Sequence, residues 1–444
     1  MSDDQKDQHQ PFDGISRRDF VKRSTVATAG VSAGLMASGN FAYAGATDTI
    51  RLGLVGCGGR GTGAANDCYR SSEGIELVAM GDLFQDRMEE SKEQLRKRLG
   101  DSFKVTSDRT FLGFDAYQRV LETDVDLVIF ATPPAFRPLH LRAAVESDTH
   151  VFMEKPVATD PTGIRSVMES SQMAEKKGLA IVAGTQRRHD PAYRAAMERI
   201  HDGAIGEVKT AQVYWNQGGL WHHEREPGMS DMEWQVRNWL YFTWLSGDHI
   251  VEQHVHNIDV ANWALQAHPV KALGVGGRQS RTDPSYGHIF DHFGIEFQYE
   301  SGARVYSMCR QQEGTPSRVG EHIIGTKGTS DGHSTIEGET NWAYEGEDVN
   351  PYVQEHADLV ASIREGEPLN EGQRVAESVL TAIMGREAAY TGQEITWEEV
   401  RDAELDLVPD RFEFGSMPIP EVAEPGETTL NRGATQEQTA AADE

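Results

Sequence analysis

Short apolar runs alternate with longer amphipathic stretches along the first part of the chain. Buried strands are expected at the apolar runs, which cover residues 50–55, 75–80, 127–131, 150–153 and 179–183. The stretches between them predict helices at residues 86–99, 115–122, 139–147 and 160–177. Strands that alternate with helices at this spacing are typical of a parallel, doubly wound sheet. A ligand of such a sheet lies beyond the carboxyl ends of its strands.

From about Thr185 the pattern changes. Residues 206–215 alternate between apolar and polar side chains, as expected for a strand with one exposed face. Two strand pairs follow, one that turns at Ser301-Gly302 and one that begins at residues 321–325. Further helices are expected at residues 190–201, 247–265, 352–365 and 371–390. The chain therefore predicts a second α/β domain after the doubly wound sheet.

The stretch from Ile50 to Asp82 carries the first chemical signal. Its strand runs directly into Gly56, Gly58 and Gly61, which form a G-x-G-x-x-G loop before an Ala-rich helix. Glycine suits a tight turn that lets a pyrophosphate approach the backbone and the helix N-terminus. Asp82 ends the next strand, 21 residues past Gly61, where an acid binds ribose hydroxyls. This arrangement predicts a dinucleotide site, whereas a plain glycine-rich turn is the alternative.

Composition narrows the possible partners. The chain has 444 residues, enough for two domains, and its net charge of −28 excludes nucleic acid and an anionic membrane surface as partners. Its three cysteines, Cys57, Cys68 and Cys309, have no close pair spacing. They predict neither a disulfide framework nor a cysteine-type zinc site, and we expect them to be structural.

Both ends of the chain differ from the domains between them. Residues 16–22, SRRDFVK, match the twin-arginine export pattern, and Ala42-Tyr43-Ala44 forms a small-x-small cleavage site. Residues 1–44 are therefore expected to be an export signal that directs the protein to the periplasm, although a disordered tail is the alternative. Because this route carries folded proteins, a cofactor would be bound before export. Residues 414–444 are rich in Glu, Thr, Ala, Gly and Pro and predict a disordered acidic tail.

Candidate catalytic groups follow the fourth strand and lie on the helix at residues 247–265. Lys155 stands at the cofactor end of the sheet, where an amine can bind a substrate oxygen and take part in proton transfer. On a continuous helix, Glu252, His256 and Asp259 share one polar stripe, at spacings of four and three. An acid beside a histidine fixes its tautomer and tunes its pKa, which suits a general acid or base. The alternative is a buried histidine satisfied by a neighbouring acid.

Tryptophans are concentrated between Trp215 and Trp244, which hold five of the eight in the chain. Aromatic faces with interleaved polar groups suit a sugar ring, although core or interface packing is the alternative. The substrate-binding residues expected on this basis are Arg187, Trp221, Trp234, Asn238 and Trp239. No nearby histidine pair has the spacing of a zinc helix, so we expect no metal.

Together these motifs resemble the Gfo/Idh/MocA family of oxidoreductases. The resemblance covers residues 49–400 and rests on GLVGCGGRG, ATPP, EKP and E-x-x-x-H-x-x-D, the last of which has Glu252 where the family usually has aspartate. It implies a Rossmann domain at residues 45–185, followed by a domain at residues 186–413 with a large, open, mostly antiparallel sheet. Helices between residues 352 and 390 would pack back on the Rossmann domain. The resemblance also implies a homo-oligomer and NAD(P)-dependent chemistry on sugars or cyclitols.

The expected function is therefore hydride transfer between nicotinamide and a hydroxyl carbon of a sugar or cyclitol. Asp82 favours NAD over NADP because it would repel a 2′-phosphate. The expected catalytic residues are Lys155, His256, Glu252 and Asp259. The expected cofactor-binding residues are Gly56, Gly58, Gly59, Arg60, Gly61, Asp82, Thr132, Pro133, His140, Glu154 and Lys155. Two alternatives stay open: a redox-assisted glycosidase that keeps and recycles tightly bound NAD, and a non-catalytic dinucleotide- or sugar-binding protein.

Overall fold

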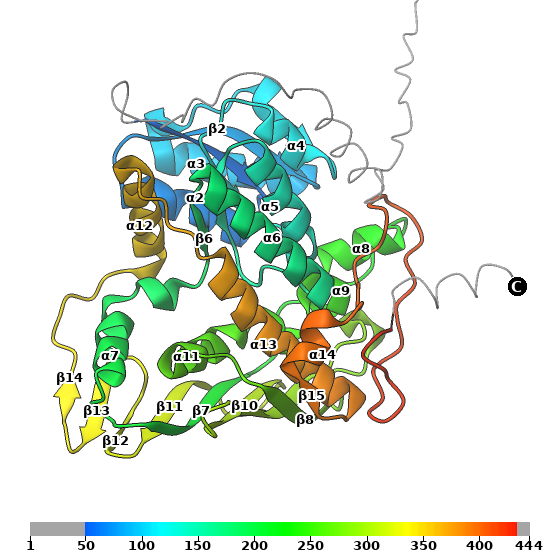
Figure 1. Cartoon of the computed structure of the whole chain (residues 1–444). Helices are drawn as coiled ribbons and strands as arrows, with labels where there is room; N and C mark the ends of the chain where they lie inside the picture. Colours follow the sequence, from blue (N-terminus) through cyan, green and yellow to red (C-terminus); the bar gives the residue numbers. More distant parts are fainter. Residues whose placement is uncertain (1–48, 433–444) are drawn as a thin grey trace, which may run out of the picture.

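The computed structural model describes residues 49–432, which form two packed domains (Figure 1). The expected export signal at residues 1–44 and the end of the expected tail, from residue 433, lie outside the described residues. No helix in the described part is long and apolar enough to span a membrane.

The first domain confirms the doubly wound parallel sheet. Six parallel strands lie in the order β3-β2-β1-β4-β5-β6. Their bounds are β1 (Ile50–Val55), β2 (Ile75–Asp82), β3 (Thr110–Leu112), β4 (Leu127–Phe130), β5 (His150–Met153) and β6 (Ile181–Ala183). The helices that cover the sheet are α2 (Gly59–Ser71), α3 (Gln85–Leu99), α4 (Ala116–Leu121), α5 (Arg137–Glu146) and α6 (Pro161–Lys177). Strand β3 was not expected, because its three residues are too few to show a periodicity.

Pairing register brings the strand ends to one edge of this sheet. Val55 pairs with Gly81 on one side and with Phe130 on the other, and Phe130 pairs with Met153. The residues that follow these strands therefore lie side by side. The apolar strands are buried almost throughout, which explains why their register is fixed.

The second domain is built on a nine-stranded sheet in the order β14-β13-β12-β11-β7-β10-β9-β8-β15. Among its pairs, only β7 with β10 is parallel. The bounds are β7 (Val208–Gln217), β8 (Lys271–Gly277), β9 (His292–Gln298), β10 (Arg304–Gln311), β11 (Arg318–Gly325), β12 (Gly328–Ser330), β13 (Thr335–Gly338), β14 (Trp342–Ala343) and β15 (Ile395–Thr396). Helices lie over one face, and the other face is open (Figure 1). The mostly antiparallel sheet is thereby confirmed.

Several helices connect the two sheets. Helix α12 packs against α2, and α13 lies between α6 and β8. The bounds of the helices after β6 are α7 (Pro191–His201), α8 (Asp231–Arg237), α9 (Thr243–Ser246), α10 (His249–Glu252), α11 (Val255–Leu265), α12 (Pro351–Glu365), α13 (Gly372–Thr391) and α14 (Trp397–Asp402).

The prediction of a single helix at residues 247–265 is wrong, because the helix is interrupted after Glu252. Helix α10 ends there and α11 begins at Val255. The carbonyl of Glu252, which would accept the amide of His256 in a continuous helix, instead accepts a hydrogen bond from Lys155 Nζ. A side chain from the other domain thus takes the place of a helical hydrogen bond.

The expected disorder is also wrong for residues 414–432, which pack on the domains. Met417 is 6% exposed, the amide of Gly426 donates to the carbonyl of Thr391, and Arg432 pairs with Glu387. Glu, Thr and Pro are common in disordered chains, so the composition predicted disorder. In this segment they lie between a few apolar residues that pack on the domains, such as Met417 and Leu430.

Candidate active site

The glycine loop follows β1 at the common strand edge. Gly56 has a φ of +94°, which favours glycine, and a Cβ atom at Gly61 would overlap the carbonyl oxygen of Gly56. At Gly58 and Gly59 a Cβ atom would meet no heavy atom within 4 Å. Bare backbone therefore borders open space at the start of α2, so the loop fits a pyrophosphate.

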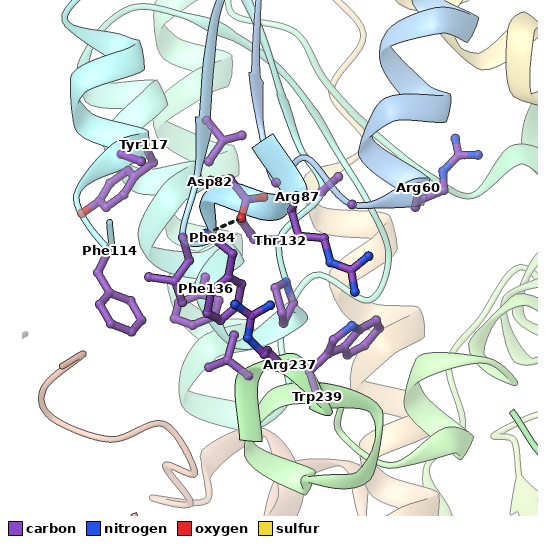
Figure 2. Close-up of a pocket in the computed structure, with 18 of the residues that line it drawn as sticks. Arg60, Asp82, Phe84, Arg87, Phe114, Tyr117, Thr132, Phe136, Arg237 and Trp239 are labelled. Carbon is purple, nitrogen blue, oxygen red and sulfur yellow. Dashed lines mark hydrogen bonds between the residues drawn. The ribbon is translucent and has the colours of Figure 1, made fainter. Parts of the chain in front are cut away.

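A cavity of about 550 Å³ extends from this loop along the strand ends. Figure 2 shows the cavity with its Rossmann residues above and residues of the second domain below. Eight of the expected cofactor residues line it: Gly56, Gly58, Gly59, Arg60, Asp82, Thr132, Pro133 and His140. The structure thus brings together groups that are up to 84 positions apart in sequence, from Gly56 to His140.

Asp82 braces the loop as well as facing the cavity. Its carboxylate accepts the amide of Cys57 at 2.5 Å and the amide of Phe84 at 2.7 Å. Burial raises the pKa of this carboxyl group. Each carboxylate oxygen still has capacity to accept another hydrogen bond, so the same group fits a ribose.

His140 lies in the wall of the cavity as a neutral ring. It stacks on Tyr117 with ring centroids 4.3 Å apart, and its Nδ1 lies 3.3 Å from Thr132 Oγ1. Burial, with the nearby charge of Arg137, lowers its pKa to about 3. An uncharged wall suits the apolar face of a nucleoside better than its phosphates.

Arg60 is placed differently from the expectation. Although it lines the cavity, its Nε donates to Glu154, and its guanidinium carbon lies 4.8 Å from the ring centroid of Tyr352. Glu154 is thereby occupied by an ion pair. The Arg60–Glu154 pair connects the glycine loop to the end of β5, and the contact of Arg60 with Tyr352 connects the loop to α12.

Lys155 and Glu252 meet across the domain boundary. Lys155 Nζ lies 3.1 Å from Glu252 Oε1 and also donates to the Glu252 carbonyl. The lysine side chain is 11% exposed and the glutamate 8%. The pair therefore combines a hydrogen-bond donor and an acidic acceptor at a nearly dry site next to the cofactor edge.

His256 lies beside this pair at the start of α11. Burial and the neighbouring charges of Lys155 and Arg187 hold its pKa well below the usual value, so the ring is neutral. The ring lies 5.8 Å from that of Trp215, and its buried Nδ1 has no hydrogen-bond partner among the described residues. A neutral imidazole with a free nitrogen can accept a proton.

Asp259 makes no hydrogen bond to His256 among the described residues, although its negative charge opposes the lowering of the His256 pKa. Its carboxylate binds Arg188 at 2.8 and 2.9 Å, Ser378 at 2.7 Å and Arg374 at 3.3 Å. These groups keep its pKa below the usual range despite complete burial. The carboxylate therefore faces α13 and connects α11 to it.

Arg187 belongs to a neighbouring polar cluster around Glu321, a residue that was expected only as part of a strand. Arg187 pairs with Glu321, Asn257 Nδ2 donates to it at 2.6 Å, and the hydroxyl of Tyr193 does so at 3.3 Å. Glu321 and Ile323 are two residues apart on β11, so the Glu321 side chain points to the same inner face of the sheet as the buried Ile323. An acid at an inward position was the signal that could have identified it.

No group of three or more His, Cys, Asp or Glu side chains between residues 49 and 432 could hold a metal ion. The three cysteines are all buried and unpaired. Cys57 lies in the glycine loop, where it packs against Met88 with the two sulfur atoms 3.9 Å apart.

Comparison with known families agrees with this geometry. The family model "Oxidoreductase family, NAD-binding Rossmann fold" matches residues 50–185, and the "GFO/IDH/MocA C-terminal domain" matches residues 193–331. The chain belongs to the Gfo/Idh/MocA family. It is an oxidoreductase with an NAD-binding Rossmann domain.

Individual relatives match between 41% and 79% of the chain. An inositol 2-dehydrogenase from Rubrobacter xylanophilus is 28% identical over 64% of this chain and 72% of its own length. A glycosyl hydrolase family 109 protein from Streptomyces coelicolor is 29% identical over 41% of this chain and 36% of its own length. The scyllo-inositol dehydrogenase of Lactobacillus casei, solved with NAD(H) and scyllo-inositol, shares the fold with a TM-score of 0.60 and 20% identity. That structure covers 79% of this chain and 99% of its own.

Within this Gfo/Idh/MocA chain, the residues expected to bind a sugar fall into three groups. Trp234 is 6% exposed and donates to the carbonyl of His223, and fully buried Asn238 bridges the His223 amide and the Ser285 carbonyl. Trp221 and Trp239 line the cofactor cavity instead. The prediction of substrate contacts is wrong for the first pair, because their polar atoms hold the local fold. Of the five residues, Arg187 alone lies in the polar cluster beside His256.

Proposed function

We propose that this protein oxidises or reduces a hydroxyl carbon of a sugar or cyclitol with NAD. The observation that carries this proposal is the placement of Lys155, Glu252 and His256 beside the strand edge that holds the glycine loop. The names of the related inositol dehydrogenases support a polyol substrate.

The chain's own residues would handle the proton. When bound, NAD supplies the acceptor or donor of a hydride at its nicotinamide ring. Lys155 can donate a hydrogen bond to the reacting oxygen while Glu252 holds the amine in place. The neutral ring of His256 can take the proton of the hydroxyl group. Glu252 and His256 are buried and the Lys155 side chain is 11% exposed, which limits competition from bulk water.

A panel of neutral polyols tests this function. The purified protein with NAD is mixed with myo-inositol, scyllo-inositol and glucose, and the absorbance of NADH is recorded. We expect NADH formation with at least one of them, and none with a Lys155→Met variant. The proposal would be contradicted if the protein bound the dinucleotide but neither formed NADH from any polyol nor consumed NADH with the matching ketones.

A redox-assisted glycosidase that retains NAD is the second candidate. The family 109 relative supports it, and so does a cofactor cavity that is walled by both domains. Release of nitrophenol from aryl glycosides without net NADH would favour it over the dehydrogenase. Intact Lys155 and His256 argue against a protein that only binds its ligands.

We also propose export through the twin-arginine route, which rests on residues 16–22 and the cleavage pattern at residues 42–44. NAD would then be bound before the protein leaves the cytoplasm. In a bacterial host with this pathway, the protein should appear in the periplasm. An Arg17→Lys, Arg18→Lys double variant should remain in the cytoplasm, and equal fractionation of the two proteins would contradict the proposal.

Finally, we propose that the open face of the second sheet forms a homo-oligomer. Val275 and Met308 flank Gly294 in register, and Leu273 and Tyr306 stand in the adjacent row. These four large apolar side chains are 48–73% exposed, and a patch of this kind usually marks an interface. Light scattering should give at least twice the chain mass, and a Val275→Glu, Met308→Glu variant should lower it. A monomeric wild type would contradict the proposal.

A further inference from the structure

The cavity beside Asp82 is walled by both domains. The Rossmann side contributes Phe84, Arg87 and Phe114, and the second domain contributes Trp221, Arg237 and Trp239. Figure 2 shows Arg237 and Trp239 on the green ribbon of the second domain, facing the residues on the blue ribbon. This part of the cavity adjoins Asp82, the residue that fits the adenosine ribose. A group bound there would touch both domains.

The second-domain wall is held firmly in its own domain. The His223 amide donates to Asn238 Oδ1 at 2.8 Å, and Trp234 Nε1 donates to the His223 carbonyl at 3.0 Å. Tyr241 donates to the carbonyl of Trp221 at 2.7 Å. These bonds tie residues 221–223 to α8 and the turn after it. The wall is therefore part of the fold and does not behave as a loose loop.

Arg237 joins this wall to the Rossmann domain at the edge of the cavity. Its guanidinium carbon lies 3.8 Å from the ring centroid of Phe84, and two of its nitrogen atoms bind Asp86 at 3.1 and 3.2 Å. Asp86 is largely exposed, so the ion pair is weak by itself. A single side chain that stacks and pairs across the seam nevertheless aligns the two walls.

The C-terminal segment reinforces the same seam from outside. Phe412 lies 4.9 Å from Phe136 and 6.0 Å from Phe114, and Phe414 lies 5.3 Å from Phe114 and 6.1 Å from Phe84, measured between ring centroids. The same segment is fastened to α8, since Gln235 Nε2 donates to the carbonyl of Met417 at 2.5 Å. In Figure 1 this red segment runs beside α8.

We propose that the wall at residues 221–239 encloses the adenosine half of the dinucleotide, and that the strap formed by Phe412 and Phe414 holds the Rossmann side of the cavity against it from outside and so limits release. This inference rests on the proposed function, because it takes the cavity to be the dinucleotide site. For the cofactor to leave, Arg237 must part from Phe84 and the aromatic strap must separate from Phe114. The dinucleotide then remains bound between turnovers, as an exported protein with little external NAD would require.

Release of NADH is measured directly, without turnover. The protein is loaded with NADH and passed through a desalting column, and the loss of NADH fluorescence is followed after mixing with excess NAD. We expect wild type to keep NADH through the column. A Phe412→Ala, Phe414→Ala variant should release it about tenfold faster or more, as the loss of two aromatic contacts predicts. Tyr344→Ala, which removes an aromatic side chain at the far end of the second sheet, should release NADH at the wild-type rate.

Two further variants guard against a folding defect. Phe414→Leu changes a half-exposed ring, and Arg237→Met keeps the stem but removes the ion pair, so both should melt near wild type and still release NADH faster. Wild-type release rates in all of these variants would overturn the inference. Faster release in a protein that oxidises no polyol would leave the inference standing and remove the proposed dehydrogenase function.

Discussion

The glycine cradle, residues 50–82, and the proposed catalytic cluster of Lys155, Glu252 and His256 stand at the same edge of one sheet, yet they are built in opposite ways. The cradle comes from one continuous stretch, residues 50–82, and its working part is bare backbone at Gly58 and Gly59. The cluster joins Lys155 of the first domain to Glu252 and His256 of the second, and it works through side chains. A local motif can be recognised from its spacing, whereas the cluster exists only when two domains dock.

The two regions also treat charge differently. Around the cradle, His140 and Phe136 form an uncharged wall. In the cluster, Lys155 lies beside the buried acid Glu252, and in the neighbouring polar cluster Arg187 lies beside the buried acid Glu321. Buried pairs require both partners, because a charge left alone is costly. Substitutions in the cluster should therefore lower kcat or the free energy of unfolding, and substitutions in the cradle should weaken cofactor binding.

The largest effect is expected for Lys155→Met. Removal of the donor should lower kcat about 10³-fold, within the range for a lost acid–base group, while NADH affinity changes little. Steady-state rates and NADH fluorescence titration check both quantities. Lys209→Met, which replaces an exposed side chain of β7, should leave the rate unchanged. A parallel loss of NADH affinity would show that Lys155 belongs to the cradle and not to the cluster.

Asp259→Asn should act on stability. Loss of the negative charge leaves Arg188 without its paired carboxylate, whereas Arg374 keeps Glu371 at 2.8 Å. The free energy of unfolding should fall by about 3–5 kcal/mol, the range for breaking a buried ion pair. Urea unfolding measures this, and the kcat of the folded fraction should stay within about tenfold of wild type if no reacting proton passes through this residue. A rate as low as that of the lysine variant, with unchanged stability, would instead place Asp259 in the proton path.

Gly61→Ala and Gly59→Ala distinguish two requirements of the glycine loop: close packing inside the turn at Gly61, and open space for the phosphates at Gly59. An alanine at Gly61 would overlap the Gly56 carbonyl, so we expect a lower Tm and NADH binding weakened by about 100-fold or more. Gly59 borders open space, so Gly59→Ala should keep the wild-type Tm. Its NADH affinity should still fall, because the added methyl group occupies space that the phosphates approach. Unchanged affinity in both variants would remove the cradle from the cofactor site.

The smallest effect concerns pH and lies outside both regions. Burial lowers the pKa of His288 to about 3, below the value of 6.5 expected for the unfolded chain. The unfolded state therefore binds more protons once the pH falls below 6.5, and the folded state loses stability as the pH falls. At pH 5.5 this histidine should cost about 1.4 kcal/mol relative to pH 7.5.

A His288→Gln variant isolates that contribution. Its free energy of unfolding, measured with urea at both pH values, should drop less than that of wild type by the same amount. The comparison between the two proteins cancels the other buried histidines, among them His140 and His254. An equal drop in both proteins would show that His288 does not titrate on unfolding.

The sequence by itself determined the parallel sheet, the cofactor loop and the position of Lys155 at the strand edge. Each of these depends on short-range physics: apolar runs bury themselves, glycine permits a backbone that other residues resist, and a residue after a strand must lie at its end. It also led to Glu252 and His256, although by way of a continuous helix that does not form.

Only the tertiary structure decided which partner each buried polar side chain has. Lys155 donates to the Glu252 carbonyl where the expected helix is interrupted, Asp259 pairs with two arginines, and Glu321 is the partner of Arg187. Trp221 and Trp239 line the same cavity as the glycine loop, because Arg237 of the same segment packs on Phe84 of the Rossmann domain. A buried charge or ring is satisfied by whichever group the fold brings near, and sequence spacing carries no information about a neighbour from another domain.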